Sequence, residues 1–210
     1  MYNDKYIALI REEMAMGIEF ELKYEANAQT QDTLRCALDA AAEGKDISME
    51  TTYYDTPGGD LSARHYTLRR RLENGVSVCT VKTPAGKLGR GEWETEGDTI
   101  EAAIEPLCLL GAPKNLLLLT LNGVEAICGA RFLRRCYMLE TEGCTVEVAI
   151  DRGVLTGGGQ ELPLFEVEVE LKKGSRDAAI RFAAALAEKY GLKQQRQSKF
   201  RRAWALYKGE

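Results

Sequence analysis

Near the amino terminus, residues 18–24 read IEFELKY. Charged side chains alternate with apolar ones, and successive side chains of a β-strand point to opposite faces of a sheet. The stretch therefore predicts a strand with one charged and one apolar face. Residues 165–171 read FEVEVEL and repeat the pattern with a glutamate at every second position. Such a face most often meets water, but aligned glutamates repel one another unless cations lie among them.

Cations do occur at matching positions of other predicted strands. Residues 67–84 read TLRRRLENGVSVCTVKTP and predict a hairpin whose turn is Asn74-Gly75. The stretch GRGEWETE, residues 89–96, also alternates, and Glu147 and Asp151 share one face of another strand. The basic side chains collected in this way are Arg69, Arg71, Lys82, Arg90, Arg134 and Lys199.

The order of elements predicts an α+β fold. About eight strands are expected, with helices at residues 29–42, 98–112, 114–128 and 175–190 and a short helix at the end. Many strands at regular spacing favour a closed eight-stranded antiparallel β-barrel with helices packed outside. Because the apolar stripes of the helices need a partner, we expect the apolar strand faces to point outward. The charged faces would then line the interior.

Composition limits the classes of function that the protein can have. The net charge is −4 and the pI about 5.3, which argues against a nucleic-acid partner. No apolar run reaches the roughly 18 residues of a membrane span, and the N-terminus does not resemble a signal peptide, so we expect a cytoplasmic protein. The six cysteines form no C-x-x-C pair, and there is one histidine, so a zinc site is not expected. Residues 1–16 are predicted to be an extension, and residues 17–210 a single domain.

Acids and bases inside one lumen are suited to one kind of ligand. Buried unpaired charges are very costly. Carboxylates bind hard cations such as Mg²⁺ or Mn²⁺ through oxygen, and arginine binds anions with several oxygens in bidentate fashion. A polyphosphate that carries divalent metal satisfies both sets. The chain has no Walker A motif, so P-loop chemistry is not expected.

These residues resemble the triphosphate tunnel metalloenzymes of the CYTH superfamily, and among them the bacterial inorganic triphosphatases. The opening motif E-x-E-x-K corresponds to Glu19, Glu21 and Lys23. The further matches, in chain order, are YYDTP at 53–57, LRRR at 68–71, TVKTP at 80–84, RGEWE at 90–94, EVAIDRG at 147–153, EVEVELKKG at 166–174 and QSK at 197–199. The resemblance covers about residues 17–205, and eight matches in the family's order are specific where one alone is weak.

The resemblance implies a closed triphosphate tunnel with a basic and an acidic half. It implies phosphate binding by Lys23, Arg69, Arg71, Lys82, Arg90, Arg134 and Lys199. It implies that one or two Mg²⁺ or Mn²⁺ ions are held by Glu19, Glu21, Glu92, Glu94, Asp151, Glu166, Glu168 and Glu170. Asp151 is alternatively expected to orient an arginine. The residues expected closest to the chemistry are Glu21, Lys23, Glu168 and Glu170.

The expected activity is metal-dependent hydrolysis of the terminal phosphoanhydride of inorganic tripolyphosphate. Metal-positioned water would attack the terminal phosphorus, and the cations would stabilise the leaving pyrophosphate. The alternatives are a thiamine or nucleoside triphosphatase, a class IV adenylate cyclase, and a polyphosphate-binding module without catalysis. The expected partner is a small molecule that contains a triphosphate, and the oligomeric state is left open between a monomer and a homodimer.

Overall fold

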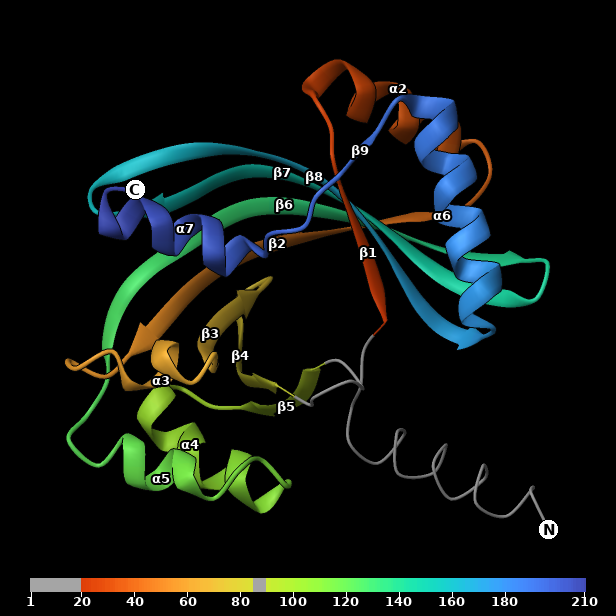
Figure 1. Ribbon diagram of the computed structural model, residues 1–210. Coiled ribbons are helices and arrows are strands. Elements are labelled where there is room, and N and C mark those ends of the chain that lie inside the picture. The colour runs from red at the N-terminus through yellow and green to blue at the C-terminus, as the bar shows by residue number, and fades with distance from the viewer. Residues whose placement is uncertain (1–19, 85–89) are drawn as a thin grey trace, which may run out of the picture. The chain divides into compact units, whose positions relative to one another are not determined.

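The computed structural model describes residues 20–84 and 90–210, without the side chain of Arg90. The strands are β1 (Glu21–Glu25), β2 (Gly44–Asp55), β3 (Thr67–Glu73), β4 (Val76–Pro84), β5 (Arg90–Glu96), β6 (Glu125–Thr141), β7 (Cys144–Gly157), β8 (Gln160–Gly174) and β9 (Lys193–Gln194) (Figure 1). The helices are α2 (Ala28–Asp39), α3 (Asp60–Ala63), α4 (Ile100–Leu109), α5 (Asn115–Leu119), α6 (Arg176–Tyr190) and α7 (Lys199–Lys208). The predicted extension at residues 1–16 and the predicted metal ligand Glu19 lie outside the described residues.

The strands form one sheet in the order β5-β4-β3-β2-β6-β7-β8-β1-β9. In the described part of the chain the sheet has nine strands and is open, with β5 and β9 as its edges. The prediction of a closed eight-stranded barrel is therefore wrong in both strand number and closure. The reason lies at β1, which pairs with β8 on one side and with β9 on the other, at Tyr24 and Glu25. β9 is only two residues long, too short to leave an alternating pattern in the sequence.

The chain divides into two compact units. Within the described residues, unit 1 contains Thr52–Leu72 and Val76–Ile127. Unit 2 contains Phe20–Thr51, Glu73–Gly75 and Cys128–Glu210. None of the helices in these described ranges combines the length and hydropathy that a membrane crossing requires.

The core of unit 2 lies between the apolar strand faces and the helices α2 and α6. Tyr24, Val148 and Val167 point to this side and pack in one cluster with Leu34 of α2 and Ala183 of α6. Helix α6 begins at Ser175, which caps the backbone N–H of Ala178, and ends at Gly191 in the left-handed region. The predicted packing of apolar faces against helices is confirmed here, and it leaves the charged faces on the opposite side of the strands.

Unit 1 repeats this arrangement on a smaller scale. Its core joins Leu68, Val81 and Cys79 of the strands to Ile104 and Leu107 of α4. The turn between β3 and β4, whose residues Glu73–Gly75 are assigned to unit 2, has positive φ at Asn74 and Gly75, as the predicted Asn-Gly turn requires.

One predicted helix of unit 1 is much shorter than expected. The helix predicted at 114–128 ends at Leu119, and strand β6 already begins at Glu125. Gly123, with a φ of 86°, lies in the turn between them. The leucine-rich sequence indicated helix beyond the point where the chain turns.

Candidate functional site

The charged face of unit 2 consists of cross-strand rows. In the antiparallel register Arg134 of β6 lies opposite Asp151 of β7, and Asp151 lies opposite Glu166 of β8. On the other side of β8, Glu168 lies opposite Lys23 of β1. Directly opposite side chains of such pairs lie about 5 Å apart at Cβ. Residues from four separate segments of the sequence therefore form one charged surface, as the alternation predicted.

Lys199 lies at the centre of this surface. It is the first residue of α7, a helix that Ser198 caps by accepting from the N–H of Arg201, and α7 packs beside β7 and β8 (Figure 1). The Lys199 Nζ atom lies 2.8 Å from Asp151 Oδ2 and 2.7 Å from Glu168 Oε1, and it also contacts Glu166. Burial alone would lower the pKa of Lys199, but the three carboxylates outweigh burial and raise it. The ammonium is therefore held charged.

Arg134 pairs with the same carboxylates from the side of β6. Its Nε and NH2 atoms donate to the two oxygens of Asp151, both at 2.7 Å, and NH2 also contacts Glu168. This bidentate geometry is the strong form of an arginine–carboxylate pair. Phe132 lies beneath both cations, with its ring centre 5.8 Å from the Arg134 guanidinium carbon and 5.4 Å from Lys199 Nζ.

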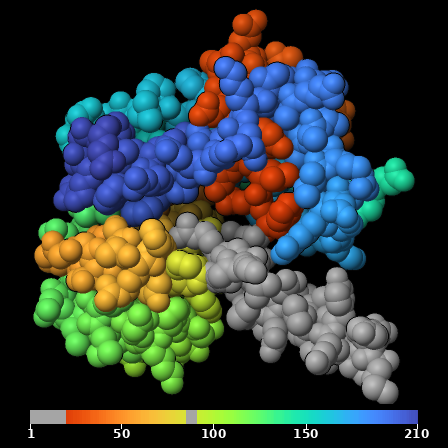
Figure 2. All heavy atoms as spheres, viewed as in Figure 1, coloured from red at the N-terminus to blue at the C-terminus, as the bar shows by residue number. Residues whose placement is uncertain are grey.

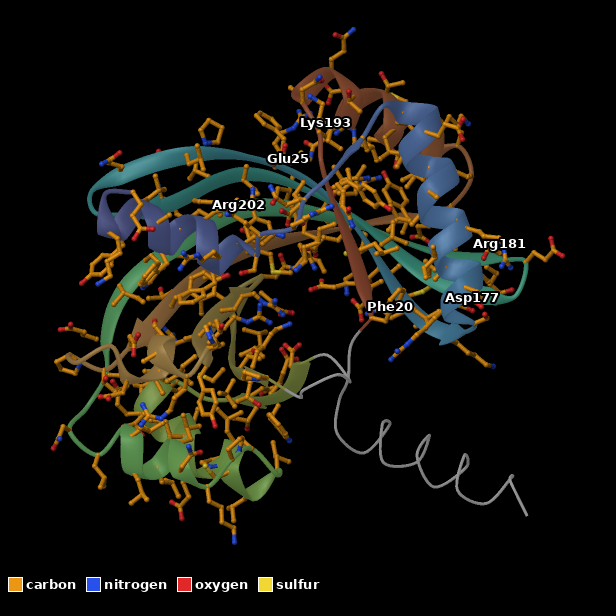
Figure 3. All side chains as sticks on the ribbon, in the orientation of Figure 1. Phe20, Glu25, Asp177, Arg181, Lys193 and Arg202 are labelled. Atoms are coloured by element: carbon orange, nitrogen blue, oxygen red, sulfur yellow. The ribbon has the colours of Figure 1, made fainter. Side chains whose placement is uncertain are left out.

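Arg202 belongs to this cluster, although it was not among the predicted site residues. It lies three residues after Lys199, on the same side of α7, and its NH2 atom pairs with Glu166. Figure 3 shows Arg202 between α7 and the strands. The signal was present in QSKFRR, because a helix that points Lys199 at the sheet also points residue 202 there. Arg201 instead is exposed and stacks on Trp204 at 4.8 Å.

The pKa values of Glu166 and Glu168, two glutamates of β8, are shifted in opposite directions. Burial raises the pKa of Glu166 to about 7, against the attraction of Lys199 and Arg202. Burial also acts to raise the pKa of Glu168, but the charges of Lys199, Arg134 and Lys23 outweigh it and hold that pKa well below the usual range. Glu166 is completely buried, whereas the side chain of Glu168 is 11% exposed. In this cluster Glu168 is therefore held ionised, whereas the buried Glu166 binds a proton more tightly than a free carboxyl group does.

The other end of the charged surface is more open. Glu21 of β1 lies opposite Glu170 of β8, and Glu170 lies opposite Glu147 of β7. The three side chains are 27, 24 and 21% exposed, respectively. Lys23 pairs with Glu21 at 2.7 Å, and Lys172 pairs with Glu170 at 2.7 Å. Lys172 also reaches Glu147 at 3.8 Å, so at this end three partly exposed carboxylates lie side by side.

The carboxylates of this surface suit a divalent cation, but three of them already contact the ammonium of Lys199. Oxygens of Asp151, Glu166 and Glu168 all lie within 4.8 Å of one another, as in a metal site. Carboxylate oxygens are the ligands of Mg²⁺ and Mn²⁺. The ammonium of Lys199, however, contacts all three. A metal ion at that point would have to displace it, whereas the row of Glu21, Glu170 and Glu147 is more accessible.

Unit 1 has its own charged cluster, from β3, β4 and β5. Lys82 lies opposite Glu92 in the β4–β5 register, and the two pair directly. Arg69 reaches Glu92 at 3.2 Å and Glu94 at 3.4 Å, and Arg71 reaches Glu94 at 3.9 Å. Thr80, at 2.9 Å, also donates to Glu94.

Five of the predicted site residues thus lie together in unit 1. Burial acts to raise the pKa of Glu94, but Arg69 and its other partners outweigh it and lower that pKa. The side chain of Arg90, the remaining predicted residue of this group, lies outside the described residues.

The YYDTP motif has a structural role in unit 1. Asp55 is buried, and its carboxylate accepts from the backbone N–H groups of Leu61 at 2.9 Å and Ser62 at 3.1 Å. It therefore closes the loop that leads into α3 by accepting from the first turn of that helix.

Comparison with known proteins gives matches over most of the chain. A family model described as the CYTH domain matches residues 17–204. The inorganic triphosphatase of Haemophilus influenzae is 27% identical over 172 residues, which are 78% of this chain and 47% of that protein. The chain thus spans about half the length of this curated relative.

Solved structures share the fold. The Hippeastrum protein HpAC1, described as a candidate adenylyl cyclase with a dominant triphosphatase activity, matches with a TM-score of 0.60 at 18% identity, over 91% of this chain and 95% of that one. A candidate adenylate cyclase of Bacillus halodurans matches with a TM-score of 0.58 at 18% identity, over 88% and 96% of the two chains. At these identities the likeness establishes the architecture of strands and helices.

Proposed function

Because the chain belongs to the CYTH domain family, we propose that it is a metal-dependent triphosphatase that cleaves the terminal phosphoanhydride bond of inorganic tripolyphosphate. Two relatives support the reaction class, one named an inorganic triphosphatase and one described as having a dominant triphosphatase activity. The observation in the molecule that carries the proposal is the buried cluster of Lys199, Arg134, Asp151, Glu166 and Glu168.

A cluster of this kind is difficult to explain by stability alone. Removing charges from water is costly, and well-packed apolar residues would serve a core equally well or better. The apolar packing of unit 2 lies on the opposite side of the strands, so the charged face is not needed to complete that core. Buried charges with shifted pKa values are typical of functional sites. A polyanion that arrives with metal would exchange the internal ion pairs for contacts with phosphate and cation.

We assign phosphate binding to the cations. In unit 2 these are Arg134, Lys199 and Lys23, with side chains 10–21% exposed. The guanidinium group of arginine can donate to two phosphate oxygens at once, and the ammonium of lysine adds a localised positive charge. During cleavage these groups would stabilise the charge that grows on the leaving pyrophosphate. In unit 1 the same role is assigned to Arg69, Arg71 and Lys82, and it is also assigned to Arg90.

We assign metal binding to the more open carboxylates. Glu21 and Glu170 lie directly opposite each other, with Glu168 as the next acid along β8. Bound Mg²⁺ or Mn²⁺ would neutralise phosphate charge and activate a water molecule for attack. Glu19, Glu92 and Glu94 remain proposed ligands on the sequence pattern. Asp151 and Glu166 are completely buried and paired with cations, so their proposed role is to orient Arg134, Lys199 and Arg202.

The first experiment measures phosphate and pyrophosphate release from tripolyphosphate, ATP and thiamine triphosphate, with Mg²⁺, with Mn²⁺ and with EDTA. Fast metal-dependent cleavage of tripolyphosphate, with ATP slow, supports the proposal. Formation of cyclic AMP and pyrophosphate from ATP would show that the protein is a cyclase and that the proposed function is wrong. Glu168→Gln is expected to abolish turnover. Glu161→Gln on the same strand is the matched control, because the Glu161 side chain is 55% exposed and pairs with Arg131 away from the cluster.

A further inference from the structure

Helix α2 carries one buried polar side chain on its apolar stripe. Gln31 is only 1% exposed and lies on the same side of the helix as the buried Leu34 and Leu38. An amide at such a position is costly unless all of its polar atoms are hydrogen-bonded. Neither composition nor periodicity singles it out, because a glutamine in a helix is ordinarily a surface residue.

The amide of Gln31 is fully used, and its partners are the backbone of the site. Its Nε2 atom donates to the carbonyl oxygen of Asp151 at 2.8 Å and to that of Glu166 at 3.1 Å. Its Oε1 atom accepts from Arg152 Nε at 3.1 Å. Arginine can only donate and a carbonyl can only accept, so the orientation of the amide is determined by its surroundings.

The two carbonyls belong to the pair of residues that hold the buried cations. Asp151 and Glu166 lie directly opposite each other in the β7–β8 register. Their carboxylates face the charged side, where Lys199 contacts both. Gln31 therefore holds the backbone of this pair from one face of the sheet, while the side chains of the same pair hold Lys199 from the other. Its own position is held in turn by Arg152, which also donates to Asp32 and to the carbonyl of Ala28 at 2.8 Å each.

We infer that Gln31 is a positioning residue, which sets the placement of Asp151 and Glu166 and through them the placement of Lys199 toward the triphosphate. This role rests on the proposed function. An active-site displacement of about 1 Å can cost roughly 100-fold in rate, so a side chain that determines where two site residues lie affects catalysis without touching substrate. An apolar side chain of similar volume would fill the same space and leave the two carbonyls without this donor.

The test compares Gln31→Met with Gln29→Met. Methionine replaces the amide by an apolar chain of similar length, and Gln29 is an exposed glutamine on the same helix. Steady-state kinetics on tripolyphosphate with Mg²⁺ would be measured well below the melting temperature of each variant, with folding checked by circular dichroism. We expect kcat/KM to fall about tenfold or more in Gln31→Met and to stay within about twofold of the wild type in Gln29→Met.

A further variant separates positioning from general stability. In Gln31→Glu the size and shape of the side chain are kept, and the guanidinium of Arg152, which donates to this position, favours the ionised carboxylate, which cannot donate to the two carbonyls. We expect kcat on tripolyphosphate to fall about tenfold or more in the folded variant, with KM changed less than kcat. A role in stability alone would lower the melting temperature and leave kcat of the folded protein unchanged.

The outcomes separate this inference from the proposed function. If the wild type turns over tripolyphosphate and Gln31→Met does so equally well, the positioning role is wrong and the proposed function stands. An unchanged kcat in folded Gln31→Glu would likewise overturn the positioning role. If the wild type does not turn over the substrate at all, the proposed function is wrong, and the positioning role, which depends on it, is wrong as well.

Discussion

The ammonium of Lys199 donates to the carboxylate of Glu168 at 2.7 Å, across 31 positions of the sequence. This contact joins the last helix of the chain to strand β8. In Figure 2, α7 appears in the darkest blue on the surface of unit 2. The side chain of Lys199 is only 10% exposed, whereas Tyr207 near the end of the same helix is 39% exposed. Helix α7 therefore supplies charge to the sheet as well as packing against it.

Removing Lys199 should destabilise the protein and open a metal site. Lys199→Met leaves three carboxylates with oxygens within 4.8 Å of one another and without their shared cation. Breaking a buried ion pair costs about 3–5 kcal/mol. Because a divalent cation can take the place of the ammonium, Mg²⁺ or Mn²⁺ should raise the melting temperature of the variant more than that of the wild type. Equal shifts in both proteins, measured by thermal melts with and without metal, would contradict this account of the cluster.

Loss of Arg202 should affect the same cluster from the helix side. Arg202→Met leaves Glu166, which is completely buried, with Lys199 but without its second cation. An incompletely satisfied buried partner costs about 1–3 kcal/mol, so the free energy of unfolding should fall by that amount. Arg201→Met is the matched control, since Arg201 is exposed and its effect should stay within about 0.5 kcal/mol. Denaturant melts check both, and equal effects would remove Arg202 from the cluster.

The raised pKa of Glu166 predicts a pH dependence of stability. Its pKa in the folded protein is about 7, above the ordinary value of 4.5. A raised acid pKa means that the folded state binds the proton more tightly, so this contribution is complete below about pH 4.5 and is lost as pH rises through 7. The shift corresponds to about 3 kcal/mol.

Glu166→Gln, which mimics the protonated acid, isolates this contribution. Relative to the wild type, the variant should gain stability as pH rises from 5 to 8, as measured by urea melts at each pH. The subtraction removes contributions common to both proteins, among them the opposite one from Glu168, whose lowered pKa favours folding at higher pH. A difference that does not change with pH would show that Glu166 does not titrate in this range.

The open end of the surface yields a test of the metal assignment. Glu170→Gln should lower kcat on tripolyphosphate about 100-fold or more and raise the Mg²⁺ concentration needed for half-maximal rate. The fold should be kept, and the melting temperature should change little, because relief of the repulsion from Glu21 and Glu147 offsets the loss of the ion pair with Lys172. An unchanged metal requirement would contradict the assignment of Glu170 as a ligand.

Much of the charged surface was predictable because the side-chain period of a strand is two. Once the apolar face of β8 is buried, Glu166, Glu168 and Glu170 have only the other face available. The same argument predicts that Lys23 and Asp151 lie on the charged face of their strands. The partner of each residue was not predictable, because cross-strand register depends on the folded sheet. Nothing in the sequence states that Glu166 lies opposite Asp151.

The features that were not predicted correctly have physical reasons of their own. Closure of the sheet was inferred from strand number, whereas the edge of β1 is taken by the two-residue strand β9. Arg202 was missed because only the QSK motif of the short helix predicted at the end of the chain was assigned to the site, and the side of that helix facing the sheet was not inferred. Gln31 was missed because its role depends on backbone carbonyls, which carry no sequence signal.

In the proposed reaction, water attacks the terminal phosphorus of tripolyphosphate in a metal-dependent step. The most direct measurement is ³¹P NMR of tripolyphosphate incubated with the protein and Mg²⁺ in ¹⁸O-labelled water. We predict equal amounts of orthophosphate and pyrophosphate, with ¹⁸O in the orthophosphate alone and no reaction in EDTA. Unchanged tripolyphosphate, or ¹⁸O in the pyrophosphate, would contradict it.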